Sequence, residues 1–536
     1  VAGQAFIAEY MARWAPKNPR LDLFGNPVMF RDEILASKEK RHTLPLLVVF
    51  TSLGEVNNKG ADLYVTLAEA FRTRFPRDDV VFRAGASEAE MSRHAHLAEV
   101  ASTGQDQARR LVSAEDLVPD GEEKALKIDG YTLSPDHSLL LLYTNSKRVW
   151  RSNSRGDYWI LHRETGALRQ LGGEDARPSS LMFAKLSPTG THVAYVRDRN
   201  IHLEALSDHS IRTLTTSGSR HVFNGRFDWV YEEEFGDDQG LFWSGDGQRL
   251  AYLRFNESQV REFHMPVYGQ LYPDPYTFKY PKAGEDNSEV SVHIYTLAEN
   301  KSRSIAVPKS AYYIPRIKWT QDPSVLCIFT MNRHQNDLRL LLTEGEFPND
   351  RLGTKEVFKE SCDTYIDIND NLTFLADGSS FVMTSERDEF NHIYKFDFEG
   401  NAVQLTQGEW DVVDVLGFDA KRKRIYFSSS KEGATQKHTS HVDMRGRVTT
   451  LDATSGTHSD DFSNSFDYSI HQHSTANTPP VYTLRDRNGK VIRTLKDNAS
   501  LRETLAEHGA DIDCGVGCCQ RVGAHLRHCL FVGHNA

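Results

Sequence analysis

The sequence has few cysteines, no long apolar run and no basic excess, and each absence excludes a class of protein. Of its six cysteines, only Cys327 and Cys362 precede the C-terminal segment, so a disulfide framework does not hold the chain together. No window approaches the roughly 18 consecutive apolar residues that a membrane-spanning helix needs. The net charge is −11, whereas a protein that follows nucleic-acid phosphates needs a basic surface. We therefore expect no nucleic-acid partner.

The length and composition allow a large folded core. At 536 residues, with 39% hydrophobic residues, the chain either forms several domain-sized units or uses one repeat architecture. It opens on Val1 rather than Met and shows no basic-then-apolar leader. We expect either that a targeting segment has been removed or that the chain is a fragment.

A short theme recurs from residue 111 onward: a polar turn of the Ser-Pro-Asp-Gly type, an apolar strand, a second turn and another strand. Seven turn positions, 43 to 76 residues apart, begin these units: Ser134, Ser187, Ser244, Thr320, Ala376, Asp419 and Ser463. Four-stranded propeller blades need this spacing, so we predict an all-β propeller over residues 111–509 with seven visible blade-like units. A β-sandwich array is the alternative, and the spacing favours the propeller.

Three segments depart from this pattern. Residues 261–288 are rich in proline and aromatic residues and lack helical periodicity, which indicates an ordered loop or an extended arm. Residues 1–110 resemble one β-α-β unit followed by a polar, helical-looking stretch over 87–110, or else are an aberrant N-terminus. Residues 510–536 form a Cys- and His-rich tail with little strand pattern.

The tail contains enough ligand types for zinc. Its candidate ligands are Cys514, Cys518, Cys519, Cys529, His525 and His528. Their spacing matches no regular C-x2-C pattern, so we assign no metal site and no cofactor, and favour an aberrant terminus from a shifted reading frame or truncated gene model.

The stretch DWVYEEEF, residues 228–235, is the first candidate for chemistry. Adjacent carboxylates in a partly desolvated pocket raise one another's pKa, so keeping two of them ionised requires a cation between them, and a substrate ammonium suits. The alternative is a solvated helical turn over Glu232 to Glu234. Phe227, Trp229 and Tyr231 alternate along this β-prone stretch and would fix its backbone against a core, which favours the functional interpretation.

A second candidate is the segment around Arg151, where arginines alternate with aromatic residues over residues 147–161. An arginine anchored beside Trp150 can present a planar fork to a carbonyl or carboxylate. The alternative is an arginine that forms a surface ion pair at a strand end.

These motifs occur together and in order. DWVYEEEF, the Trp150-Arg151 pair and the blade starts accompany LVSAEDLVP, GDYWIL, LMFAKLSP, AYLRFNES, YPKAGEDNS and TMNRHQND. Together they closely resemble the N-terminal, eight-bladed propeller of the dipeptidyl peptidase IV family of serine peptidases, from about residue 111 to about residue 508. The resemblance implies that Glu233 and Glu234 bind the free amino terminus of a peptide and that Arg151 holds a substrate carbonyl. Such a carboxylate pair would measure the distance to the scissile bond.

The resemblance also implies what this chain lacks. Family members continue into an α/β-hydrolase domain with a Gly-x-Ser-x-Gly elbow followed by Asp and His. The nearest string, residues 85–89, lacks the final glycine and precedes the propeller, so we assign no catalytic residue. We also find no first-blade pattern before residue 111, so one of the eight blades is absent, unrecognised or replaced.

The expected function is therefore a substrate-gating propeller of a dipeptidyl peptidase IV-like enzyme that releases N-terminal Xaa-Pro or Xaa-Ala dipeptides and is inactive without its catalytic domain. One alternative is a non-catalytic propeller that binds peptides or proteins. Another is a polypeptide that forms no stable fold, because a missing blade leaves an open edge. The resemblance also implies peptide partners with a free N-terminus, a homodimer as one option, and an extracytoplasmic location, either periplasmic or membrane-tethered.

Overall fold

The structure is a computed structural model, and it describes residues 97–99, 109–237, 239–347 and 351–507. The chain divides into two compact units, Val1–His94 and Ala95–Ala536. The first unit lies outside the described residues, as do the predicted β-α-β unit and the Cys- and His-rich tail. Within the described residues, no helix is long and apolar enough to cross a membrane.

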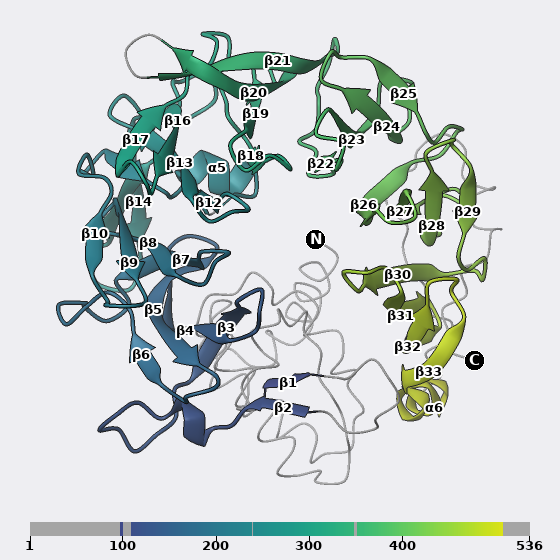
Figure 1. Cartoon of the computed structure of the whole chain (residues 1–536), viewed down its shortest axis with the longest axis horizontal. Helices are drawn as coiled ribbons and strands as arrows, with labels where there is room; N and C mark the ends of the chain where they lie inside the picture. The colour runs from purple at the N-terminus through teal and green to yellow at the C-terminus, as the bar shows by residue number, and fades with distance from the viewer. Residues whose placement is uncertain (1–96, 100–108, 238, 348–350, 508–536) are drawn as a thin grey trace. The chain divides into compact units, whose positions relative to one another are not determined.

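The second unit is built from four-stranded antiparallel blades that follow one another in chain order (Figure 1). The first two blades share one sheet and comprise β3 (Ile128–Leu133), β4 (Leu139–Arg148), β5 (Asn153–His162) and β6 (Leu168–Gln170), then β7 (Leu181–Leu186), β8 (His192–Arg197), β9 (Asn200–Ala205) and β10 (Ile211–Thr213). The third comprises β11 (Val222–Asn224), β12 (Leu241–Trp243), β13 (Arg249–Asn256), β16 (Glu289–Thr296) and β17 (Lys301–Ser304). Its first strand is split, because both β11 and β12 pair with β13.

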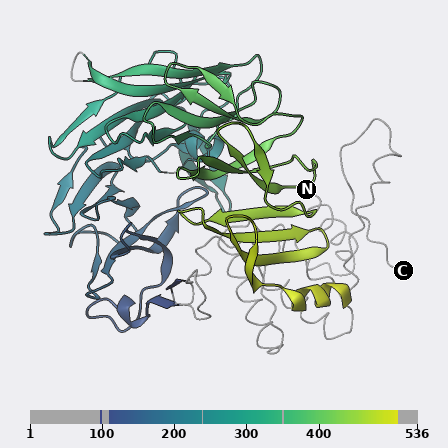
Figure 2. The same cartoon turned by 45° about the vertical axis from the view of Figure 1, so that its right-hand side comes forward.

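Four more blades complete the described part. They comprise β18 (Ile317–Trp319), β19 (Leu326–Met331), β20 (Asp337–Phe347) and β21 (Arg351–Ser361); β22 (Thr373–Phe374), β23 (Ser380–Ser385), β24 (His392–Asp397) and β25 (Ala402–Gln404); β26 (Val412–Asp419), β27 (Arg424–Ser429), β28 (His438–Asp443) and β29 (Val448–Thr450); and β30 (Thr457–Phe462), β31 (Tyr468–Thr475), β32 (Thr478–Asp486) and β33 (Val491–Lys496). Figure 2 shows the last blade with α6 (Ala499–Glu507) beside it. The predicted all-β propeller is confirmed, and the boundaries at 110 and 509 stay predictions.

The polar turns that begin the predicted units connect the first two strands of their blades. In the first blade, the Ser134 hydroxyl accepts a hydrogen bond from the Leu139 amide at 2.9 Å, and the Ser134 amide donates to the Leu139 carbonyl at 3.0 Å. Ser244 makes the equivalent pair of bonds with Arg249, both at 2.9 Å. A small polar side chain thus closes the hairpin locally, which is why the sequence pattern located the blades.

The apolar cores lie between successive blades. Val193 and Tyr195 of β8 pack with Leu139 and Leu141 of β4, and one large cluster runs through the third, fourth and fifth blades. Blades with a neighbour on each side can bury both faces, which explains the nearly continuous burial of β19, β23 and β27.

Two segments outside the blades are strands. The predicted arm is a hairpin in which β14 (Glu262–Val267) pairs with β15 (Asp274–Lys279). β1 (Leu97–Glu99) pairs with β2 (Arg109–Val112), so the helical interpretation of residues 87–110 is wrong at these positions.

Candidate functional site

The glutamate triplet lies on a one-and-a-half-turn helix, α5 (Trp229–Glu234), in the connection between β11 and β12. The β-prone interpretation of this stretch is therefore wrong. Asp228 begins the helix from an extended conformation, and its carboxylate accepts a hydrogen bond from the Tyr231 amide at 3.0 Å. Phe227 and Tyr231, four residues apart, stack with ring centres 5.6 Å apart. Trp229 packs instead against Tyr280, with ring centres 4.4 Å apart, so the three aromatic residues do not line one face of a strand.

Buried contacts hold α5 in place. Tyr231 is 1% exposed, and its hydroxyl accepts a hydrogen bond from the Ile314 amide, which precedes the fourth blade, at 2.9 Å. Ser288 donates to the second carboxylate oxygen of Asp228 at 2.7 Å. After the helix, Asp237 accepts a hydrogen bond from Arg316 at 2.7 Å. The helix is therefore anchored to its own blade and to the next one, which fixes the positions of its glutamates.

Arg151 lies in the loop between β4 and β5 of the first blade. Arg148 donates through Nε to the Trp150 carbonyl at 2.8 Å, and the Val149 amide donates to the Ser152 carbonyl at 3.1 Å, so the loop is a closed turn. The Arg226 guanidinium lies 5.7 Å from the centre of the Trp150 ring, a cation–π contact between this loop and the segment that leads into α5.

The loop and the helix meet through two of the three glutamates. Arg151 forms a bidentate pair with Glu233, in which Nε donates to Oε2 and Nη2 donates to Oε1. Glu232 Oε1 accepts hydrogen bonds from the backbone amides of Arg151 at 3.0 Å and Ser152 at 3.2 Å. The bonds from Arg151 lower the pKa of Glu233, although its slight burial opposes them. Glu233 is therefore an ionised carboxylate at neutral pH.

Glu234 is exposed, and the described residues offer it no hydrogen bond or ion pair. The three carboxylates lie near two guanidinium groups, those of Arg151 and Arg226, so negative charge is in excess at this site. The Arg151 side chain is 65% exposed and that of Glu233 is 25% exposed, so solutes can reach the pair. Such an arrangement can bind a small cation beside a planar donor.

The structure brings Arg151 and Glu233 into direct contact. Glu234 is the next residue of the same helix, and the described residues show no hydrogen bond or ion pair between it and Arg151. Sequence reasoning missed Glu232, whose contacts position the Arg151 loop, and Arg226, which lies against Trp150. Arg226 lies two residues before Asp228, so its closeness to the DWVYEEEF motif could have drawn attention to it. The sequence could not reveal that Arg226 contacts Trp150, which belongs to another blade.

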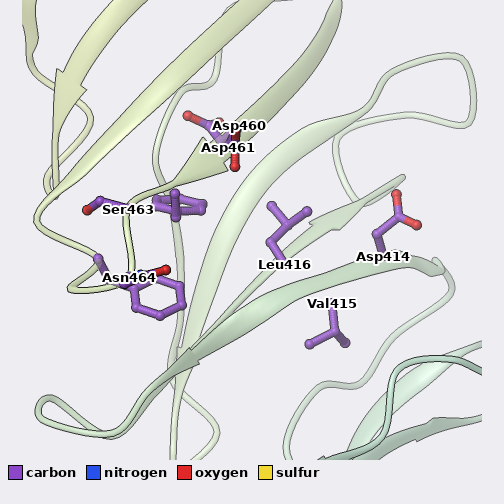
Figure 3. Close-up of a pocket in the computed structure, with 9 residues that line it drawn as sticks. Asp414, Val415, Leu416, Asp460, Asp461, Ser463 and Asn464 are labelled. Atoms are coloured by element: carbon purple, nitrogen blue, oxygen red, sulfur yellow. The ribbon is translucent and has the colours of Figure 1, made fainter. Parts of the chain in front are cut away.

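A cleft of about 600 Å³ lies elsewhere, between the sixth and seventh blades. Figure 3 shows Asp414, Val415 and Leu416 of β26 on one side, with Asp460 and Asp461 of β30 on the other. None of the predicted site residues lines it.

Comparisons with known proteins agree on one family. The family model described as the dipeptidyl peptidase IV N-terminal region matches residues 134–480. Dipeptidyl aminopeptidase B of Saccharomyces cerevisiae is 31% identical over 337 residues, which cover 60% of this chain and 40% of that protein. Dipeptidyl peptidase 4 of Trichophyton tonsurans is 30% identical over 398 residues, which cover 70% of this chain and 50% of that protein. The chain spans about half the length of the curated relatives it matches.

A solved structure extends the likeness to three dimensions. The crystal structure of Porphyromonas gingivalis dipeptidyl peptidase 4 matches with a TM-score of 0.67 and 34% identity, over 74% of this chain and 56% of that one.

Proposed function

We propose that this chain, which belongs to the dipeptidyl peptidase IV family through its N-terminal region, is the propeller that admits and positions substrate for a serine peptidase releasing N-terminal dipeptides. In this proposal Glu233 and Glu234 bind the ammonium of a peptide, and Arg151 holds a carbonyl near that end. A hydrolase domain would supply the nucleophile, base and oxyanion hole. The preferred second residue would be proline or alanine, as the family resemblance implies.

One observation carries the proposal: Arg151 of the first blade and Glu233 of the third, 82 residues apart, form a bidentate pair. The Arg151 guanidinium pairs with Glu233, so it does not neutralise the negative charge of the next residue, Glu234. An incoming ammonium therefore gains a carboxylate partner at Glu234, and a second at Glu233 where it shares the carboxylate with Arg151. Because both anchors belong to packed blades, they would set a defined distance from the amino terminus to the bond that is cut.

The test compares Gly-Pro with N-acetyl-Gly-Pro by titration calorimetry on the full chain. We expect the free amine to bind at least ten times more tightly, because acetylation removes the charge that the glutamates recognise. Glu234→Gln should abolish this preference, whereas the control Glu409→Gln, which removes an exposed carboxylate from the connection between the fifth and sixth blades, should leave it unchanged. Equal affinity for the two peptides would contradict an ammonium site and would favour a propeller that binds partners by another surface.

The pH dependence adds a second readout. Glu233 has a lowered pKa and is ionised throughout the neutral range, so the ligand amine is the group that titrates. An α-amino group loses its proton near pH 8, so affinity for Gly-Pro should fall as the pH rises past about 8, while affinity for the acetylated peptide should not change.

Catalysis is tested separately with a Gly-Pro chromogenic substrate. We expect this chain alone to give no turnover. Turnover that a serine-directed phosphonate blocks would show that the chain contains a nucleophile and would contradict that expectation.

A further inference from the structure

The contact region between the sixth and seventh blades joins an aromatic cluster, in which Tyr426 packs on Phe462 and Phe466, to a group of buried polar residues that the other described contact regions lack. The fifth and sixth blades meet through residues such as Val382, Ile393, Ile425 and Val442. The next contact region buries these polar residues to 8% exposure or less: His438, Thr439, His441, His458, Asp460, His471 and Arg485. Buried polar groups cost folding free energy unless they are satisfied, so this cluster needs an explanation beyond packing.

Two imidazoles in this region are oriented by acceptors. His458 of β30 is 0% exposed, and its Nε2 lies 2.7 Å from the Thr454 carbonyl oxygen. His471 of β31 is 1% exposed, and its Nδ1 lies 3.0 Å from Asp460 Oδ2. A carbonyl oxygen only accepts, and Asp460 acts as an acceptor through its other oxygen as well, because Oδ1 accepts a hydrogen bond from the Ser469 hydroxyl at 2.8 Å. Each neutral ring therefore carries its proton on the nitrogen that faces its acceptor.

This assignment leaves two lone pairs facing each other. His458 Nδ1 and His471 Nε2 lie 3.2 Å apart, and each is the unprotonated nitrogen of its ring. Two acceptors cannot form a hydrogen bond, so the pair requires a cation between them. Strand register creates this geometry, because β30 pairs Asp460 with His471 and His458 with His473, which makes His458 and His471 diagonal neighbours.

A carboxylate lies beside the two nitrogens. Asp452, in the loop between β29 and β30, has Oδ2 4.0 Å from His458 Nδ1, and the three ligand atoms all lie within 4.8 Å of one another. The same oxygen accepts a hydrogen bond from Arg485 Nη2 at 2.8 Å. Asp452 and Asp460 together outnumber this single guanidinium, so the cluster has a negative excess that a cation would offset.

We propose that His458 Nδ1, His471 Nε2 and Asp452 Oδ2 bind a divalent transition-metal ion, with Zn²⁺ as the representative. Zinc–nitrogen bonds of 2.0–2.1 Å at a tetrahedral angle place two nitrogens about 3.3 Å apart, close to the separation observed here. The Thr454 carbonyl and Asp460 occupy the places of the oxygen acceptors that usually orient metal-binding histidines. Two imidazoles and one carboxylate form a donor set that suits this class of ion.

The competing occupant is a proton shared by the two rings. A proton between the two rings would bridge only the two nitrogens, whereas a metal ion would also engage Asp452 Oδ2, which lies 4.0 Å from His458 Nδ1. Asp460 also lines the cleft of Figure 3 together with Asp414 and Asp461. The proposal does not depend on the peptide site of α5.

The test uses the full chain after chelator dialysis, titrated with ZnCl₂ by calorimetry and with CoCl₂ by visible absorption. We expect one Zn²⁺ equivalent whose affinity falls at least 100-fold in His458→Gln and in His471→Gln. Asp460→Asn should weaken binding 10- to 100-fold, because it loosens the orientation of His471. His473→Gln is the matched control: the centres of the His473 and His458 rings lie 4.6 Å apart, but His473 Nε2 faces the Ser455 carbonyl, so affinity should be unchanged.

Two further measurements separate metal binding from misfolding and from other ligands. Arg485→Gln removes the positive charge that is paired with Asp452, so this variant should bind Zn²⁺ more tightly and still unfold cooperatively. A variant that had lost its fold would not show a higher affinity. The Co²⁺ spectrum should show nitrogen and oxygen ligation. Thiolate charge-transfer bands that persist in His458→Gln would assign the ion to cysteines and overturn the proposal. Absence of Zn²⁺ binding by the wild type, which would leave a shared proton, would also overturn it.

Discussion

At the scale of single residues, three adjacent glutamates have three different environments. A helix rotates successive side chains by about 100°, so Glu232, Glu233 and Glu234 point in different directions. Glu232 accepts backbone amides, Glu233 pairs with Arg151, and Glu234 is exposed. Composition and motif indicated Glu233, Glu234 and Arg151, but the role of Glu232 depends on a loop that lies 80 residues away in the chain.

A residue near this site predicts a pH-dependent stability. Burial raises the pKa of Glu257 from 4.5 to about 7, although Arg226 partly opposes it. Between these values the folded state binds a proton that the unfolded state releases, so the contribution of Glu257 to stability is present below pH 4.5 and is lost as the pH rises to about 7. Because Glu257 is only partly buried, solvent screens part of this effect, and we expect the loss to be on the order of 1–2 kcal/mol.

The measurement is the free energy of urea unfolding at pH 5 and pH 8. Glu257→Gln should reduce the decrease between these two pH values by the amount given above, and the exposed control Glu409→Gln should retain the full decrease. The same pH dependence in wild type and Glu257→Gln would show that Glu257 is not the titrating group.

At the scale of elements, α5 shows why local propensity failed. Residues 228–231 combine aromatic and β-branched side chains that favour strands, yet the cap at Asp228 and the buried contacts of Tyr231 stabilise a helix. Tertiary packing decided between the two. The blades were predictable because a polar turn connects the first two strands of each, and at Ser134 and Ser244 the serine side chain itself closes this turn.

The strand end before α5 predicts a large effect of one methyl group. Gly225 has φ of +74°, and a Cβ there would lie 2.7 Å from Leu241 Cδ2 and 2.9 Å from Val196 Cγ2. Gly225→Ala should therefore lower the free energy of unfolding by roughly 2–5 kcal/mol, from backbone strain plus overpacking. Gly236 has φ of +67° with nothing within 4 Å of its Cβ position, so Gly236→Ala should cost only the backbone term of about 1–2 kcal/mol.

Guanidinium unfolding of the two variants measures both values. Equal losses in the two variants would indicate that the space around Gly225 is not tight.

At the scale of the whole described unit, the contacts between blades carry the stability. The hydrogen bond from the Ile314 amide to the Tyr231 hydroxyl joins the third and fourth blades in a buried position. Tyr231→Phe should therefore cost roughly 1–3 kcal/mol, because it leaves a buried N–H without its acceptor. Tyr131→Phe is the control, since Tyr131 is 48% exposed and should change stability by less than about 0.5 kcal/mol.

Thermal and denaturant unfolding, followed by circular dichroism, would measure both variants. A neutral effect of Tyr231→Phe would show that water or another acceptor replaces the hydroxyl.

The sequence by itself determined the blades, the family and the candidate residues Arg151, Glu233 and Glu234, because turns, alternation and motifs are encoded by residues close together in the chain. Only the tertiary structure decided that DWVYEEEF is helical, that Glu232 holds the Arg151 loop, and that His458 and His471 face each other. Those features depend on strand register and on contacts between distant segments, and local sequence does not specify which distant residue will lie opposite.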